Sequence, residues 1–231
     1  MKRIIIVGIG EMGDMLYEYL SFDSNYDVVA FATEHGYGDI KEKKGLPVFF
    51  LEDLTEFFSN EECRLMVAIS FVEMNQTRKR VYEKVKSLGY KCASYVSTKS
   101  SVWRDALIGE NVIIMEGATV QYSASIGDNV VMWPNSSIGH HCIVKDHCWI
   151  SAGSVVGGFA TVEESSFLGI NSSVKGRTVI GRSSLIGAGV YINKNTEDYS
   201  LYGNTSYKNE LAGIENTEKR KQFQLATLKS S

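Results

Sequence analysis

The sequence has little excess charge of either sign and no long apolar run. Its 231 residues carry a formal net charge of −3, and the acidic and basic residues are mixed along the chain. This balance does not favour nucleic acid or a membrane surface as a partner. No segment approaches ~20 apolar residues, so we expect no membrane-spanning helix. The apolar run in the opening MKRIIIVGIGEMGD is short and broken by glycine, which argues against a signal peptide.

Cysteine is also scarce. The four cysteines, Cys63, Cys92, Cys142 and Cys148, form no CxxC pair. Two of them, Cys142 and Cys148, occupy equivalent positions of a repeat described below. We therefore interpret all four as buried thiols of a protein in the reducing cytoplasm.

The first region, residues 1–97, alternates strand-like and helical patterns. With 44% hydrophobic residues, the chain is long enough for one large or two modest domains. A helix is expected from about residue 75 to 88, with Asn75 capping its start and Gly89 making the left-handed turn at its end. The pattern predicts a small parallel sheet with helices. The strand-like runs are IIIVGIG, DVVAFA, LPVFF, RLMVAIS and CASYV, and MLYEYL is helical.

The second region, residues 98–204, repeats every six residues. One series is aliphatic or Met throughout, and a second series four residues later holds no large or charged residue. Glycine often follows the aliphatic residue. The first series is Val102, Ile108, Ile114, Val120, Ile126, Met132, Ile138, Val144, Ile150, Val156, Val162, Leu168, Val174, Ile180, Ile186 and Ile192. The second series runs from Ala106 to Thr196 in the same register.

A period of six is typical of short strands joined by tight corners, as in a β-helix. The aliphatic residue is expected inside, the small residue beside it, and the glycine at the corner, where it would adopt the backbone angles of the turn. Three hexads would form one triangular coil of about eighteen residues, stacked on the next by backbone hydrogen bonds. The period does not give the handedness.

These hexads, the phrases FLGINSSV at 167–174 and SIGHHC at 137–142, and the α/β region before them resemble the NeuD/PglD family of sugar acyltransferases. The resemblance covers almost the whole chain and weakens after about residue 204, leaving 205–231 as a C-terminal extension. It implies a Rossmann-like domain before a left-handed parallel β-helix. It also implies a homotrimer with acyl-CoA bound between neighbouring helices, so that the active site lies between subunits.

Three of the four histidines lie in SSIGHHCIVKDHC, at 136–148. His140 and His141 occupy one predicted corner, whereas His147 occupies the next, so their side chains are not expected to converge on one metal ion. We predict no metal, although a zinc site between subunits, as in the γ-type carbonic anhydrases, is the alternative. His147 is expected to be a solvated corner residue.

The resemblance aligns His140 with the general base of the family, which removes a proton from the attacking amine or hydroxyl. The family usually has an acidic residue directly after that histidine to orient it. This chain has His141 there, so the orienting group is open, and His141 is itself an alternative base.

The resemblance also places the acyl donor. Gly158 lies eighteen residues after His140 and Gly176 eighteen further, which predicts a groove without side chains above the base. Gly158 N–H would bind the thioester carbonyl. The other expected CoA contacts are Trp149, Ile170, Ala188 and Gly203. Gly203 belongs to YGNTSYK, where relatives have G-x-P-A-K. Lys208 or the run 219–221 would meet CoA phosphates, or else belong to an exposed helix face.

Gly8, Gly10 and Gly13 follow a predicted strand and precede a helix, where backbone N–H groups bind a diphosphate. About 95 residues are too few for both halves of a dinucleotide fold, which argues against an NAD dehydrogenase. The resemblance implies a nucleotide-sugar site on this loop, with Glu34 close to the nucleotide base.

Together these features predict an acetyl-CoA-dependent N-acetyltransferase that acts on a nucleotide-linked amino sugar. The expected sugar is a 4-amino-4,6-dideoxyhexose linked to UDP or dTDP, for a surface glycan. O-acetylation of a sugar such as a sialic acid, and transfer of a longer acyl group, are alternatives within the same chemistry. A catalytically silent sugar-nucleotide-binding protein is the alternative of another class.

Overall fold

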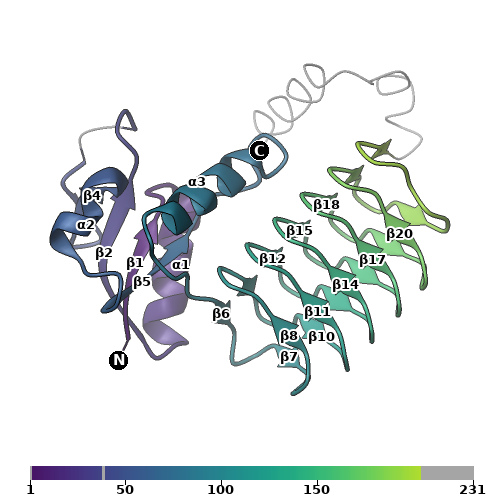
Figure 1. The fold of residues 1–231 in the computed structure, drawn as a ribbon. Helices are drawn as coiled ribbons and strands as arrows, with labels where there is room; N and C mark the ends of the chain where they lie inside the picture. Colours follow the sequence, from purple (N-terminus) through teal and green to yellow (C-terminus); the bar gives the residue numbers. More distant parts are fainter. Residues whose placement is uncertain (1, 38–39, 204–231) are drawn as a thin grey trace.

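The computed structural model describes residues 2–37 and 40–203. The N-terminal domain is built on a five-stranded sheet of order β3-β4-β2-β1-β5 (Figure 1). Its strands are β1 (Lys2–Val7), β2 (Tyr26–Thr33), β3 (Glu42–Lys43), β4 (Leu46–Phe50) and β5 (Cys63–Val67). All neighbours pair in parallel except β3 and β4, which are antiparallel. The predicted parallel sheet is confirmed, and the short β3 was not predicted.

Helices cover both faces of this sheet because β1 alternates its buried side chains. Ile4 and Ile6 pack with α1 (Glu11–Phe22), whereas Ile5 and Val7 pack with α3 (Gln76–Ser87). The other helices among the described residues are the short η1 (Leu51–Asp53) and α2 (Leu54–Phe57). No helix in the described ranges is long and apolar enough to cross a bilayer.

The two predicted caps of α3 have different outcomes. Gly89 has φ +83°, so the left-handed turn after the helix is confirmed. Asn75 precedes the helix, but its side chain caps nothing, so that prediction was wrong. Asn75 itself is left-handed, with φ 66°, and its side chain is buried, with Nδ2 3.5 Å from the carbonyl oxygen of Ser166. A tertiary contact with the β-helix has replaced the local cap.

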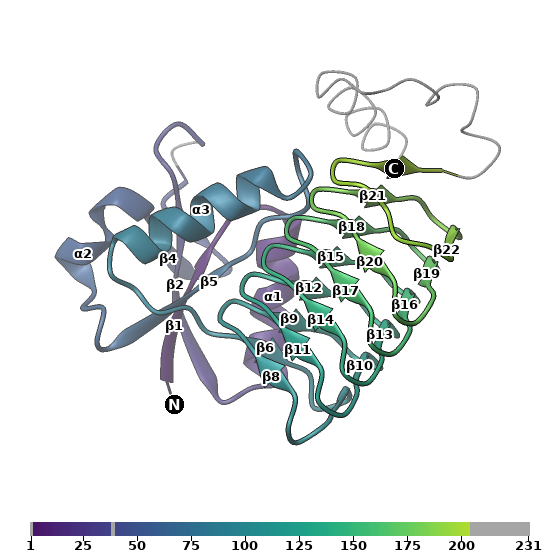
Figure 2. The same ribbon diagram turned by 45° about the vertical axis from the view of Figure 1, so that its right-hand side comes forward.

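The rest of the described chain is the β-helix, whose two-residue strands form three parallel sheets (Figure 2). We call these sheets the first, second and third faces. The first face contains β6 (Tyr95–Val96), β9 (Ile113–Ile114), β12 (Val131–Met132), β15 (Trp149–Ile150), β18 (Phe167–Leu168), β21 (Leu185–Ile186) and β23 (Leu201–Tyr202). The second face contains β7 (Ser101–Val102), β10 (Thr119–Val120), β13 (Ser137–Ile138), β16 (Val155–Val156), β19 (Ser173–Val174) and β22 (Tyr191–Ile192). The third face contains β8 (Leu107–Ile108), β11 (Ser125–Ile126), β14 (Ile143–Val144), β17 (Thr161–Val162) and β20 (Val179–Ile180).

The predicted hexad is confirmed residue by residue. Each residue of the aliphatic series from Val102 to Ile192 ends a two-residue strand, and together they form the interior of the β-helix. Partners such as Thr119 and Ser137 are eighteen residues apart, as expected for three hexads in a coil. β6 already pairs with β9, so the β-helix starts at Tyr95, slightly before the predicted boundary at 97.

The expected reason for the hexad glycines was wrong. The left-handed backbone angle falls on the fourth residue of every hexad from the one begun by Ile108 to the one begun by Ile186, for example Asn129 with φ 57° and His141 with φ 58°. The glycines at the second position do not have a positive φ. They are needed because the next coil passes too closely: a Cβ on Gly139 would lie 2.7 Å from the backbone nitrogen of Gly158. Close stacking of coils, and not the turn, selects glycine there.

The first face of the β-helix packs against the N-terminal domain (Figure 2). Its outward side chains Ile113, Val131 and Trp149 join the core that holds α1. Next to this core, the buried Arg78 of α3 donates to the carbonyl oxygens of Val67, Ile69 and Asn111, at 2.5, 3.2 and 3.2 Å. The domains therefore share apolar and polar contacts.

A buried ladder of polar side chains reaches His147 at the corner between the third and first faces. Val67 N–H donates to Asn111 Oδ1 (2.7 Å), Asn111 Nδ2 donates to Asn129 Oδ1 (2.7 Å), and Asn129 Nδ2 lies 2.9 Å from His147 Nδ1. His147 is 7% exposed and its ring meets Tyr82 of α3 edge to face. The expectation of a solvated corner was wrong because α3 covers this corner. Burial lowers the pKa of His147.

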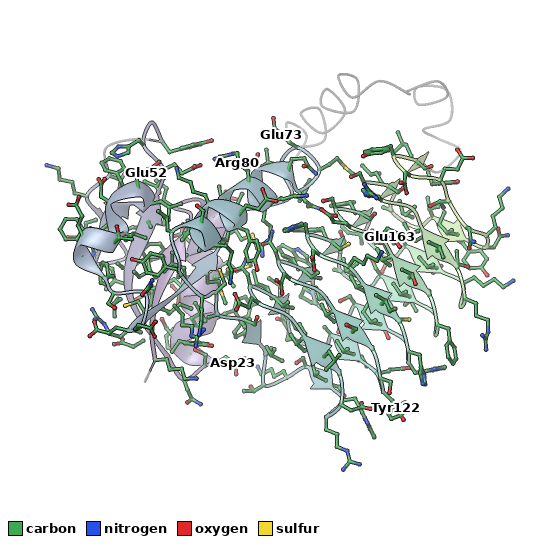
Figure 3. The ribbon with its side chains drawn as sticks, viewed as in Figure 1. Asp23, Glu52, Glu73, Arg80, Tyr122 and Glu163 are labelled. Atoms are coloured by element: carbon green, nitrogen blue, oxygen red, sulfur yellow. The ribbon has the colours of Figure 1, made fainter. Side chains whose placement is uncertain are left out.

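Asp23, directly after α1, ties the N-terminal domain to the first coil (Figure 3). Its carboxylate accepts hydrogen bonds from Thr98 Oγ1, Tyr95 Oη (2.7 Å), Ser97 Oγ (2.9 Å) and Thr98 N–H (3.1 Å). These donors, led by the Thr98 side chain, lower the pKa of Asp23 to about 2. The charged form is favoured in the folded state. This stabilisation is therefore complete above pH ~3.9, the ordinary pKa of an aspartate in an unfolded chain, and it is lost as the pH falls through about 2.

We therefore expect Asp23→Asn to lower the free energy of unfolding by about 1–2 kcal/mol near neutral pH. Urea unfolding of both proteins measures the difference, which should shrink as pH is lowered from about 5 toward about 2. A difference that stays constant over this range would show that the charge of Asp23 contributes nothing.

Candidate functional site

A cavity of about 860 Å³ lies at the carboxyl ends of β1, β2 and β5. The ends of parallel strands commonly form the ligand site of open α/β sheets. The cavity is bounded by the glycine loop after β1, by Glu34 after β2 and by Ser70 and Phe71 after β5. Trp133 and Trp149 of the β-helix close the remaining side. The cavity is therefore shared by the two domains.

The three loop glycines have different structural roles. Gly8 has φ +131° and its missing side chain leaves room for the carbonyl of Ala68, while a Cβ on Gly13 would meet the carbonyl of Gly8. Gly10, the residue before α1, has open space where its Cβ would be. Gly8 and Gly13 thus pack the loop against β5 and α1, and Gly10 leaves space for a ligand at the helix N-terminus.

Glu34 lines the same cavity, but its carboxylate already has partners. Arg80 binds both of its oxygens, at 2.6 and 2.7 Å, and Lys84 lies 3.1 Å from Oε1. Lys84 also contacts Glu52 at 2.5 Å, and Figure 3 shows Arg80 and Glu52 on the same side of the domain. The Arg80 hydrogen bond is the main cause of a lowered pKa of Glu34. Glu34 remains ionised and would meet a ligand as part of a charged cluster.

Trp149 belongs to this cavity and not to the region of His140. Its side chain is 3% exposed, and its ring lies 5.3 Å from the Phe71 ring and 5.7 Å from the Trp133 ring. Because Trp149 points from the first face toward the N-terminal domain, it forms an aromatic wall of the N-terminal cavity. Its expected contact with CoA stays a prediction.

His140 and His141 lie at the corner between the second and third faces, which we call the His140 corner. Both side chains are exposed. The His140 backbone N–H donates to Gln121 Oε1 at 3.1 Å from the coil below. On the coil above, a Cβ on Gly158 would lie 2.7 Å from both Cε1 and Nε2 of His140. The predicted stacking of Gly158 over His140 is thus present, and only the absence of a side chain leaves Nε2 accessible.

The N–H of Gly158 is free to bind a ligand. Its neighbours Gly157 and Phe159 donate to the carbonyl oxygens of Val174 and His140, both at 2.9 Å. Among the described residues, Gly158 N–H meets no acceptor. A free backbone N–H on the residue stacked over an imidazole is an arrangement suited to stabilising an oxyanion next to a general base.

Sequence reasoning missed the residues that surround His141. Phe159 stacks on the His141 ring, with centroids 4.6 Å apart and planes at 10°. Arg177 lies over the Phe159 ring at 4.5 Å, and Tyr122 meets His141 edge to face at 5.3 Å. Phe159 and Arg177 lie eighteen and thirty-six residues after His141. The coil period could have revealed them, had it been applied to His141 as it was to His140.

The other predicted CoA contacts lie at a different corner, between the first and second faces. Ile170 is 56% exposed, Ala188 is exposed, and Gly203 follows β23 at the end of the described chain. A Cβ on Gly187 would lie 3.4 Å from Gly203 Cα, so Gly203 stacks above this corner. Lys208 and the run 219–221 lie outside the described residues. Within one chain, these predicted contacts are not brought together with His140.

The N-terminal cavity and His140 are also separated within one chain. The cavity adjoins the first face, whereas His140 lies at the corner where the second and third faces meet. In a triangular coil this corner is opposite the first face. Figure 3 shows Tyr122, one coil below His140, at the edge of the β-helix turned away from the N-terminal domain.

Metal ligands and reactive thiols are not features of either location. In residues 2–37 and 40–203, no three His, Cys, Asp or Glu side chains gather as a metal site would require. All four cysteines are free and buried, as predicted. Burial raises the pKa of Cys142, and it raises that of Cys148 to about 12, which agrees with packing and not with nucleophilic roles.

Comparisons with known proteins support this architecture. The family model of the GMPPB C-terminal domain matches residues 108–197, within the hexad region. The comparison with curated protein sequences found no significant match. Among solved structures, the acetyltransferase domain of PglB from Neisseria gonorrhoeae FA1090 has a TM-score of 0.75 at 24% identity, over 89% of this chain and 98% of that domain.

Two further solved structures share the fold. PerB from Caulobacter crescentus, in complex with CoA and GDP-perosamine, has a TM-score of 0.74 at 23% identity, covering 86% of this chain and 92% of PerB. WeeI from Acinetobacter baumannii AYE has a TM-score of 0.73 at 18% identity, covering 87% of this chain and 97% of WeeI. These likenesses show a shared fold, which in this chain is a small α/β domain followed by a β-helix of six-residue repeats. The predicted α/β domain followed by a left-handed β-helix is confirmed.

Proposed function

We propose that this protein is an acetyl-CoA-dependent N-acetyltransferase that acts on a nucleotide-linked amino sugar, a 4-amino-4,6-dideoxyhexose, in the synthesis of a surface glycan. We place the reaction in the cytoplasm, in keeping with four free, buried thiols. Likeness in fold to PerB, solved with CoA and GDP-perosamine, and to the PglB domain, solved with acetyl-CoA, supports both substrates.

The observation that carries the proposal is the position of Gly158 over His140. The acceptor amine attacks the thioester carbonyl, and His140 Nε2 accepts the proton that the amine loses. Gly158 N–H donates to the oxyanion that forms on the carbonyl oxygen. When the tetrahedral intermediate collapses, the C–S bond breaks and the CoA thiolate takes the proton from His140, so that amide and free thiol are the products and His140 is again neutral. The chemistry needs no covalent enzyme intermediate.

The separation of the two locations supports a homotrimer with the active site between subunits. A nucleotide sugar whose diphosphate lies on the Gly8–Gly13 loop faces the opposite side of its own β-helix from His140. Its sugar would therefore reach the His140 corner of a neighbouring subunit. Likewise, CoA held between helices would contact the His140 corner of one subunit and the corner of Ile170, Ala188 and Gly203 of another.

Thiol release from acetyl-CoA tests this proposal, with UDP-, dTDP- and GDP-linked amino sugars as acceptors. We expect one acceptor to give stoichiometric thiol and N-acetylated product, identified by mass spectrometry. Turnover only with hydroxyl acceptors such as a sialic acid would make the protein an O-acetyltransferase. Turnover only with a longer acyl-CoA would show that the donor is not acetyl-CoA. If calorimetry detects no binding of any acyl-CoA, the acyltransferase proposal fails.

A further inference from the structure

The two histidines of the His140 corner share one hydrogen bond. Nδ1 of His140 lies 3.1 Å from Nδ1 of His141, and the two rings are nearly perpendicular, at 89°. A hydrogen bond between two imidazole nitrogens requires a proton on one and a lone pair on the other. In one arrangement His140 carries Nδ1–H and has a free lone pair on Nε2. In the other, His141 donates and the proton of neutral His140 is on Nε2.

The surroundings fix the ring of His141. Phe159 covers one face in a parallel stack, Arg177 lies over Phe159 from the coil above, and Tyr122 meets the ring from the coil below. The backbone N–H of His141 donates to the Tyr122 carbonyl at 3.0 Å. The φ of His141, 58°, is left-handed, as it is at the fourth position of the neighbouring hexads. An otherwise exposed imidazole is therefore held with Nδ1 directed at His140.

We propose that His141 is a positioning residue whose Nδ1 accepts the Nδ1–H of His140, so that Nε2 of His140 is left unprotonated beneath Gly158. The catalytic purpose rests on the proposed function, because only a free Nε2 can take the proton of the acceptor amine. The direction of the hydrogen bond is inferred from that function, but it can be measured without any acceptor sugar, so the two proposals can fail separately. A second imidazole can thus orient a histidine as a carboxylate does, without adding a negative charge to the corner.

Nitrogen NMR of protein labelled with ¹⁵N-histidine tests the proton arrangement directly. The chain has four histidines, so each resonance can be assigned from single His→Gln variants. The spectra are recorded at a pH well above ~6.5, the ordinary pKa of histidine, so that the imidazole rings are neutral. We expect His140 to carry its proton on Nδ1. His147 is the internal reference for the opposite tautomer, because the ladder that starts at Val67 N–H makes Asn129 Nδ2 donate to His147 Nδ1.

Two variants separate the hydrogen bond from the stacking. His141→Phe keeps a ring to stack on Phe159 but has no acceptor, whereas His141→Asn offers Oδ1 near the place of Nδ1. We expect His141→Phe to lose the Nδ1–H form of His140 and to lower kcat on the order of 10- to 100-fold, as for other partners that orient a histidine. The KM for acetyl-CoA should change less than about two-fold, and His141→Asn should recover most of both properties.

The outcomes distinguish this proposal from the proposed function. A proton on Nε2 of His140 in the native protein, or no change of tautomer in His141→Phe, overturns the role of His141 whether or not any sugar is acetylated. Full activity of His141→Phe overturns its importance for catalysis. If Nδ1–H is found and is lost in His141→Phe, but no acceptor turns over, the role of His141 stands and the proposed function fails.

Discussion

Replacing His140 by alanine is expected to lower kcat by about 10²- to 10⁴-fold while acetyl-CoA still binds. Nε2 of His140 is the basic atom directly beneath the open position of Gly158. Without it, the amine that attacks the thioester must lose its proton to water, and the loss falls on the transition state more than on substrate binding. Steady-state thiol release with the acceptor found in the panel measures kcat, and calorimetry measures donor affinity.

Two controls accompany this variant. Because the His140 side chain is exposed, the melting temperature of His140→Ala should stay within about 2 °C of the native value. His35→Ala removes another exposed imidazole, which lies on the N-terminal domain 3.6 Å from Asp53, and should retain native kcat. If His140→Ala keeps more than about a tenth of native kcat, His140 is not the general base. His141, the alternative in the sequence, would then be tested in its place.

The β-helix was predictable because its coil period converts sequence distance into spatial contact. Residues eighteen apart are stacked, so Gly158 over His140 could be deduced from numbering alone. The aliphatic series was equally informative, since each residue has an interior position that tolerates only apolar side chains. The pattern placed these residues correctly, although it gave the wrong reason for the glycines, whose position is set by the close approach of the next coil.

Predictions were wrong where the N-terminal domain meets the β-helix. His147 has the same place in its hexad as the exposed His141, but α3 covers its corner, and nothing in the repeat reveals which corner is covered. Asn75 has the residue type of a helix cap, yet it is buried against the coil of Ser166. For Trp149, the period placed the residue on a strand but did not show that its side chain lines the N-terminal cavity, and its contact with CoA stays a prediction. These contacts depend on domain docking, which a one-dimensional repeat does not encode.

Gly158→Ala is the second variant with a large expected effect. The added Cβ would lie 2.7 Å from Cε1 and Nε2 of His140, so the ring must move or the space for the thioester is filled. A displacement of the base by about 1 Å is expected to cost on the order of 10²-fold in kcat. The melting temperature should change little, because the obstructed group is the end of an exposed side chain and not backbone.

Gly109→Ala is the matched control for crowding between coils. Gly109 has the second position of its hexad at the corner near α3, and its Cβ would lie 2.8 Å from the backbone carbon of Gly127, which cannot easily move. We expect this variant to lose about 1–3 kcal/mol of stability but to retain native kcat below its melting temperature. The two alanines thus separate obstruction of the base from obstruction of the fold. If Gly158→Ala is as active as the native protein, the thioester does not lie beside Gly158, and the oxyanion must be stabilised by another donor.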